Sequence, residues 1–219
     1  MRKFALFFLS IILLFQFSSC KDELNLELYL SQLRILSYTC SAEDYTVTAY
    51  AEEREDPFIS DGYVGGLKKI ITVKIENYKQ PLDNAEVTLK FPGAELSKKF
   101  EYSPLTGKFT AEIETSVLPS ENTITAIVKN QGEERVIELN KFSVNEIIDY
   151  KSALNSVSKK HGEKINKMLE NNSSIEVRLR LIVEGDRGYY YVSITDKNGD
   201  TLAYLVDGLS GEILASKNV

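Results

Sequence analysis

The segment AEVTLKF, residues 85–91, decides the fold class because its apolar and polar side chains alternate along the whole run. In an extended chain such residues point to opposite sides, so one face is apolar and the other polar. The apolar face carries Ala85, Val87, Leu89 and Phe91. This pattern is typical of a strand with one buried face, and it predicts an antiparallel sheet packed on one side.

Six similar runs surround this segment between Tyr45 and Phe142, namely YTVTAYA, IITVKIE, KKFEYS, KFTAEIE, NTITAIVK and RVIELNKF. Turn-forming residues separate them, as at Pro92-Gly93 and Gly132. Seven short strands with frequent turns predict a two-sheet β-sandwich over residues 45–142. The run QPLDNAEVTLKF, followed by PLTGKFTAEI, resembles the immunoglobulin-like modules of bacterial surface proteins. That resemblance implies an immunoglobulin-like sandwich that serves as a spacer or a binding module.

The hydrophobic period changes after Phe142, which indicates a second domain over residues 143–219. The run SVNE, from Ser143 to Glu146, has the spacing of a helix capping box. We expect a helix from there to Gly162, with His161 at its end, and a second short helix before Asn171-Asn172.

Alternating runs then return from Ile175 to Val183, in YYYVSIT and in TLAYLVD. The last two flank DKNGD, whose Asn198-Gly199 pair predicts a tight hairpin rather than a calcium loop. The overall prediction is a mostly β chain, in which the sandwich precedes an α+β domain with a helix on an antiparallel sheet.

The final run YLVDGLSGEIL resembles the last hairpin of PepSY modules. The matching positions are Val206, Asp207, Ser210, Gly211, Ile213 and Leu214. Asp207 is expected to cap the turn amides, and Gly211 is expected to need a positive φ. PepSY modules are thought to restrain or regulate peptidases, so the resemblance implies a partner protein. The candidate partner-binding residues are Tyr189 and Tyr191 of the triple tyrosine, with Asp207 and Gly211.

The N-terminus has the layout of an export signal. Arg2 and Lys3 precede an apolar run from Phe4 to Phe17, which is shorter than the about 20 residues of a membrane span. The group FSSC, which ends at Cys20, resembles the lipobox of bacterial lipoproteins. The resemblance implies a leader over residues 1–19 and a lipid on Cys20 that anchors the protein in a membrane. An ordinary signal peptide cut near Ser19 is the alternative.

The residues after Cys20 concern the destination of the protein. The run KDE at 21–23, a lysine followed by two acids, looks like the signal that sends some lipoproteins to the surface of the outer membrane. We therefore expect a cell-envelope location, at the outer membrane and exposed at the surface. Residues 20–44 are predicted to be a lipidated tether, in which leucines follow both a strand period and a helix period.

Composition argues against several other functions. The formal net charge of −6 becomes more negative once Arg2 and Lys3 are removed, which argues against nucleic-acid binding. Only two cysteines and one histidine are present, so no metal site or cofactor is expected, and Cys40 is interpreted as a small apolar strand residue. No catalytic motif is recognisable. We expect a non-enzymatic protein that binds an envelope partner such as a peptidase; a structural or carbohydrate-binding role of the sandwich is the alternative.

Overall fold

The computed structural model describes residues 24–59, 61–76, 82, 84–104, 107–142 and 147–218. Cys20 and the predicted capping box of Ser143 and Glu146 lie outside these residues. The described residues form one α-helix, one short 3-10 helix and thirteen strands of a single hydrogen-bonded sheet. The prediction of a mostly β chain with one helical region is confirmed.

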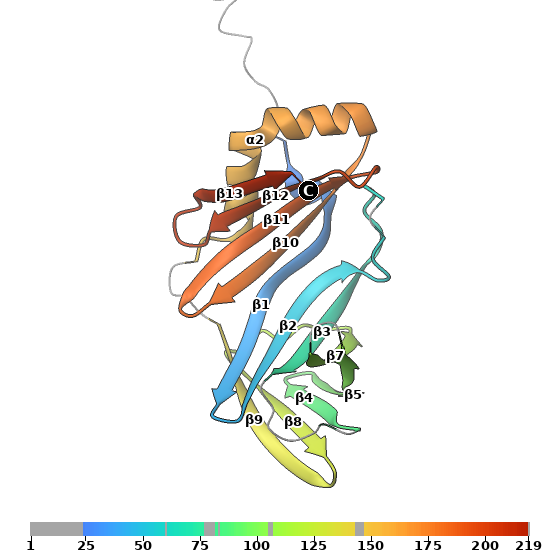
Figure 1. Cartoon of the computed structure of the whole chain (residues 1–219), viewed down its shortest axis with the longest axis vertical. Coiled ribbons are helices and arrows are strands. Elements are labelled where there is room, and N and C mark those ends of the chain that lie inside the picture. Colours follow the sequence, from blue (N-terminus) through green and yellow to red (C-terminus); the bar gives the residue numbers. More distant parts are fainter. Residues whose placement is uncertain are drawn as a thin grey trace, which may run out of the picture.

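The elements run in chain order from the 3-10 helix η1 to the last strand β13 (Figure 1). Their bounds are η1 Leu26–Tyr29, β1 Leu30–Ala42, β2 Tyr45–Glu55, β3 Leu67–Glu76, β4 Glu86–Phe91, β5 Ala94–Lys99, β6 Glu101–Ser103, β7 Lys108–Thr115, β8 Thr123–Asn130, β9 Glu133–Lys141, α2 Tyr150–Asn172, β10 Ile175–Glu184, β11 Arg187–Asp196, β12 Thr201–Asp207 and β13 Ile213–Asn218.

The sandwich half of the molecule folds the sheet over its own core. Strands β1, β2, β3, β7 and β6 are neighbours on one side, and β5, β4, β8 and β9 follow one another on the other side. A short pairing of β9 with β1 joins the two sides. The inward residues of both sides form one core that contains Val47, Ile71, Val87, Leu89 and Leu139. The alternation in residues 85–91 is thereby explained, because its apolar side faces this core.

The predicted count of seven strands is wrong. The described residues between 45 and 142 form eight strands, because the run KKFEYS is divided between β5 and β6 at Phe100, whose amide instead bonds to the carbonyl of Ala85. The first four residues of β5 were not predicted as a strand, since only Ala94 and Leu96 are partly covered and the rest of β5 is exposed and polar. In addition, β1 completes the sandwich from outside the predicted boundary.

The prediction of a tether over residues 20–44 is wrong for Leu30–Ala42, because these thirteen residues form β1, the longest of the described strands. Its first part pairs in parallel with β10, and nearly its whole length pairs with β2. The register shifts between Arg34 and Leu36, so Ile35 and Leu36 point to the same side. Leu33 and Ile35 therefore pack on the C-terminal core, whereas Leu36 packs on the sandwich core. This bulge explains why the leucines follow two periods.

In the C-terminal half, β10, β11, β12 and β13 form an antiparallel meander. The helix α2 packs on one face of it through Leu154, Val157 and Ile165, against strand residues such as Val192. The predicted break at Gly162 is wrong, because α2 continues from its N-cap Asp149 to Asn172. Figure 1 draws α2 as two limbs that meet at an angle, at one end of the long axis.

The N-terminal end of the described chain is fastened to α2. The hydroxyl of Ser158 donates a hydrogen bond of 2.7 Å to the carbonyl oxygen of Leu24. Leu26 is buried in the same core as α2. In Figure 1 the hairpin of β8 and β9 lies at the opposite end of the molecule.

Two local predictions are confirmed. The Asn198-Gly199 turn joins β11 to β12, and the carboxylate of Asp196 accepts hydrogen bonds from the amides of Asn198 and Asp200. Cys40 lies in β1 as a half-buried free thiol packed against the sandwich core.

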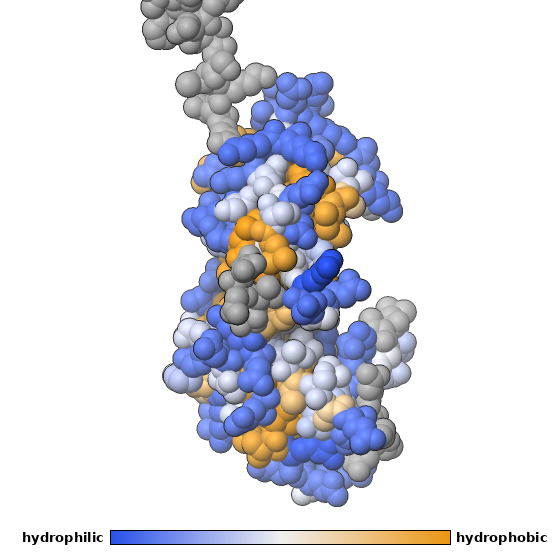
Figure 2. All heavy atoms as spheres, turned by 90° about the vertical axis from the view of Figure 1, so that its left-hand side faces the viewer, coloured by the Kyte–Doolittle hydropathy of each residue, from blue (hydrophilic) through white to orange (hydrophobic). Residues whose placement is uncertain are grey.

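The surface seen in Figure 2 is mainly hydrophilic, with smaller hydrophobic areas at mid-height and near the lower end. Among the described residues, no helix is both long and apolar enough to cross a membrane.

Candidate functional site on the open face of the sheet

Both cores lie on the same side of the sheet, so the opposite side forms one continuous surface, which we call the open face. It extends over β11, β10, β1, β2, β3 and β7. Strand pairing sets polar residues side by side across it: Tyr191 is opposite Arg180, which is opposite Arg34 on β1. Arg34 is in turn opposite Glu52 on β2.

The open face is hollowed into a groove of about 390 Å³. Its lining comes from six strands and consists of Gln32, Arg34, Tyr50, Glu52, Arg54, Thr72, Lys74, Ser103, Lys108, Thr110, Glu112 and Arg180. Arg180 on β10 and Ser103 on β6 are separated by four strands in the sheet order. Because both line the same groove, the sheet must curl around it.

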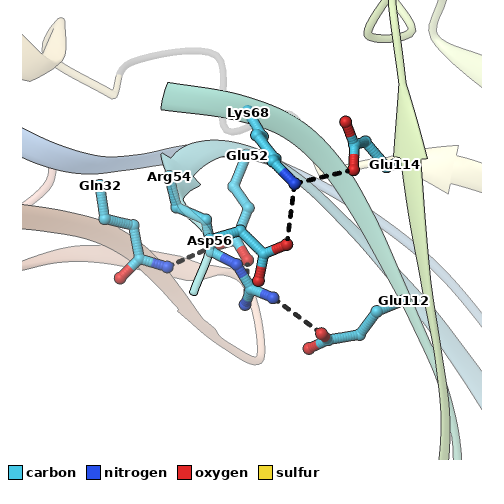
Figure 3. Close-up of polar contacts among 7 residues, drawn as sticks. All are labelled: Gln32, Glu52, Arg54, Asp56, Lys68, Glu112 and Glu114. Carbon is cyan, nitrogen blue, oxygen red and sulfur yellow. Dashed lines mark hydrogen bonds and ion pairs between the residues drawn. The ribbon is translucent and has the colours of Figure 1, made fainter. Parts of the chain in front are cut away.

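A chain of hydrogen bonds crosses the floor of the groove, and Figure 3 shows most of it. Arg180 Nε donates to Gln32 Oε1 over 2.7 Å, and Gln32 Nε2 donates to Glu52 Oε2 over 2.5 Å. Arg54 bonds to Glu52 over 3.0 Å and to Glu112 over 2.7 Å. Gln32 and Glu52 are only 4% and 3% exposed, so the network fixes the side chains around them.

Positive charge exceeds negative charge in this groove. Five basic side chains line it against two acidic ones, and Arg54 contacts both acids. Within the described ranges, no carboxylate lies at ion-pair distance from Arg34, Lys74 or Arg180. Instead, the guanidinium of Arg34 lies 4.5 Å and the ammonium of Lys74 lies 5.1 Å from the centre of the Tyr50 ring.

The pKa values of Lys74 and Arg180 reflect first their burial and then this crowding of cations. Burial, together with the charges of Arg34 and Lys108, lowers the pKa of Lys74 below its ordinary value of 10.5. Burial also lowers the pKa of Arg180, and the charges of Arg34 and Arg178 lower it further. The protonated forms are therefore less favourable here than in water.

Two polar atoms of the groove have no hydrogen-bond partner among the residues that the structure describes. They are the hydroxyl of Thr72, a residue only 7% exposed, and Nε of Arg34. Buried polar atoms are ordinarily paired, so both atoms are donors that the described residues leave unsatisfied.

The groove has a second, acidic end. An adjoining hollow shares Thr110 and Glu112 with it and is also lined by Asp56, Glu101 and Glu114. Lys68 bridges Asp56 over 3.4 Å and Glu114 over 3.1 Å at this end (Figure 3). The groove is thus electrically polarised along the open face.

The structure separates the four predicted partner-binding residues into two locations. Tyr189 and Tyr191 lie on the open face, since they pair with Ile182 and Arg180. Asp207 pairs with Tyr189 and therefore lies at the end of the same face. Gly211 lies on the opposite side, where a side chain would approach Ile148 Cδ1 and Ser156 Oγ.

The expected local roles of Asp207 and Gly211 are both found. Asp207 Oδ1 accepts hydrogen bonds from the amides of Leu209 and Ser210 and from the Ser210 hydroxyl. These bonds to Ser210 and Leu209 lower the pKa of Asp207. Gly211 has φ +72°, as expected for the turn.

His161 lies in the middle of α2 rather than at a helix end. Its ring centroid is 4.8 Å from that of Tyr204, and its Nε2 is buried without a hydrogen bond in the described part of the chain. Burial, followed by Lys160 and Lys164, lowers its pKa. No group of three or more His, Cys, Asp and Glu residues among those described is arranged to hold a metal ion.

Sequence reasoning missed Gln32, Arg34, Thr72 and Lys74 as site residues. Gln32 and Arg34 were assigned to the tether, although the alternation of QLRI was a strand signal. Thr72 and Lys74 were recognised only as the polar side of a strand. Nothing in the sequence indicated that β1 would bring them close to Arg180.

No protein-family model matches this chain, and no curated protein matches its sequence significantly.

Proposed function

We propose that this chain is a non-enzymatic, lipid-anchored protein of the cell envelope that binds a partner protein through its open face. The observation that carries the proposal is the surface composition there: Tyr191 pairs with Arg180, Tyr189 pairs with Ile182, and Arg178 lies farther along the same face of β10. Tyrosine and arginine are the residue types that contribute most to protein interfaces. Ile182, which is 38% exposed, adds an apolar contact.

The anchor is proposed from Cys20 and its lipobox-like FSSC, and the KDE run favours the surface of the outer membrane. A diacylated cysteine would hold the protein firmly in the bilayer, because each buried methylene contributes about 0.8 kcal/mol. A Cys20→Ala variant is expected to lose labelled palmitate and to appear in the soluble fraction. Unchanged membrane retention of this variant would contradict the anchor.

The identity of the partner is proposed from the resemblance of the C-terminal half to PepSY modules. One helix followed by four antiparallel strands supports this resemblance. So does the capped turn at Asp207. A peptidase of the envelope is therefore the proposed partner, and the immunoglobulin-like sandwich would serve as its spacer.

Site-specific photocross-linking in the producing cell tests the proposal. The photoreactive residue p-benzoylphenylalanine would replace Tyr191 or, as a matched control, Val136 of β9, which is 63% exposed on the other side of the sandwich. We expect a discrete protein adduct from position 191 and none from position 136. An adduct from position 136 alone would contradict the open face as the interface and favour binding by the sandwich.

A further inference from the structure

We propose that the basic end of the groove, formed by Arg34, Lys74, Arg180 and Thr72, binds an oxyanion. The ligand group is a carboxylate or phosphate, supplied by an acidic side chain of the partner or by a small free anion. The assignment to the partner rests on the proposed function, whereas anion binding itself does not.

The first argument is charge. Arg34, Lys74 and Arg180 line one groove of about 390 Å³ and have no carboxylate counterpart within the described ranges. Like charges held together in a partly buried site repel one another, and an anion placed among them offsets that repulsion. The carboxylate that is buried close by, Glu52, is already bound to Gln32 and Arg54.

The second argument is the supply of hydrogen-bond donors. Thr72 lines the groove, and its buried hydroxyl has no partner in the part of the chain that the structure describes. Arg34 Nε is likewise unpaired. Arg180 gives its Nε to Gln32, which fixes the guanidinium in place. Fixed guanidinium groups together with a hydroxyl are the donors that carboxylates and phosphates prefer.

The third argument concerns the size of the ligand. The acidic end, with Asp56, Glu101, Glu112 and Glu114, begins where the basic end stops. A long polyanion would be repelled there, so the groove selects a ligand with its negative charge confined to one short segment.

The experiment is an anion titration of the detergent-solubilised full chain, followed by thermal unfolding and by calorimetry. The probes are potassium phosphate, potassium glutarate and the capped peptide acetyl-Glu-Glu-amide, each compared with potassium chloride at equal ionic strength. Thr72→Val removes the hydroxyl at nearly constant shape, and Arg34→Gln removes one cation. Lys90→Gln on β4, whose lysine pairs with Glu95 outside the groove, is the control. Circular dichroism verifies that each variant is folded.

We expect at least one of the three probes to raise the melting temperature above the chloride value, and the Thr72→Val and Arg34→Gln variants to bind it about tenfold more weakly. The Lys90→Gln variant should bind like the wild type. Equal effects of every probe and chloride, or binding that Thr72→Val and Arg34→Gln leave unchanged, would overturn the site.

A second measurement, on the cross-linked complex, distinguishes an oxyanion supplied by the partner from a free anion. If the partner supplies it, phosphate and Arg34→Gln should both reduce the adduct formed from position 191. A probe that binds while the adduct is unaffected supports the anion site and identifies a free anion as its ligand. A probe that binds while no adduct forms at all contradicts the proposed function and leaves the anion site standing.

Discussion

Glu52 is the residue on which the network of the groove converges, because its buried carboxylate accepts hydrogen bonds from both Gln32 and Arg54. Burial of a carboxylate is tolerated only when such partners are present. The same carboxylate holds Gln32 in the position from which it accepts the hydrogen bond of Arg180. One side chain thus links the sandwich strands to the C-terminal strands.

Replacement of Glu52 by alanine should lower the free energy of unfolding by about 3 kcal/mol, since it leaves Gln32 and Arg54 without their buried partner. Glu112→Ala is the matched control, because Glu112 also pairs with Arg54 but its side chain is 53% exposed. That control should cost less than about 1 kcal/mol. Urea unfolding of both variants measures the difference, and equal losses would contradict the central role of Glu52.

Replacement of Lys74 is expected to raise the stability of the protein, whereas replacement of Glu52 is expected to lower it. The pKa of Lys74 is lowered first by burial and then by Arg34 and Lys108, so protonated Lys74 opposes folding. A Lys74→Met variant should therefore be more stable than the wild type at neutral pH.

The pH dependence follows from proton binding to Lys74. Between the lowered pKa and 10.5, the unfolded wild-type chain binds more protons at this residue than the folded chain, so wild-type stability rises with pH there. The advantage of Lys74→Met should thus be full below the lowered pKa and fade as the pH approaches 10.5. Urea unfolding of the wild type and of Lys74→Met, at neutral pH and at a pH close to 10.5, tests this. A difference in unfolding free energy that does not change with pH would contradict it.

Among the elements, the strands with strict alternation were predictable, and those shaped by their neighbours were not. Residues 85–91 and 175–183 alternate because each strand has one face on a core. The strand β1 could not be recognised by alternation, since its bulge changes the side on which its leucines point. The helix α2 passes Gly162, which does not adopt the positive φ of a helix C-cap; Ser173 has that conformation and ends the helix.

Replacement by alanine should change stability in opposite directions at two glycines, Gly208 in the turn after β12 and Gly162 in α2. A Cβ on Gly208 would lie 2.3 Å from the carbonyl oxygen of Gly188, which already accepts the Gly208 amide. Gly208→Ala should therefore cost about 2–4 kcal/mol. Gly162→Ala has free space and should raise stability by about 0.5–1 kcal/mol, as expected inside a helix. Thermal unfolding compares the two, and a neutral Gly208→Ala would refute the close approach.

At the scale of the whole molecule, β1 belongs to both halves. Leu33 and Ile35 pack on the C-terminal core, and Tyr38 is fully buried in the sandwich core. The predicted boundary near residue 45 lies where the clear alternating runs begin, and it separates β1 from β2, the strand with which it pairs. The candidate site was out of reach of sequence reasoning for the same reason, because it forms only when β1 lies between β10 and β2.

The fragment 45–142 should accordingly fail to fold, because it lacks Tyr38 and exposes the edge of β2. The fragment 24–142, which contains β1, should recover a cooperative transition. Circular dichroism during heating distinguishes the two fragments. A cooperative transition in the shorter fragment would show that the sandwich is independent of β1.

The hydrogen bond from Ser158 to Leu24 limits how the protein can stand on a bilayer. If Cys20 carries the acyl chains, it lies only four residues before Leu24, the first residue that is bound to the body of the protein. A chain of that length spans about 14 Å when fully extended. The end of the body that carries α2 must then stay close to the lipid headgroups, while the β8–β9 tip points outward (Figure 1). Anything that docks on the open face would have to approach from the flank, within a narrow layer above the membrane.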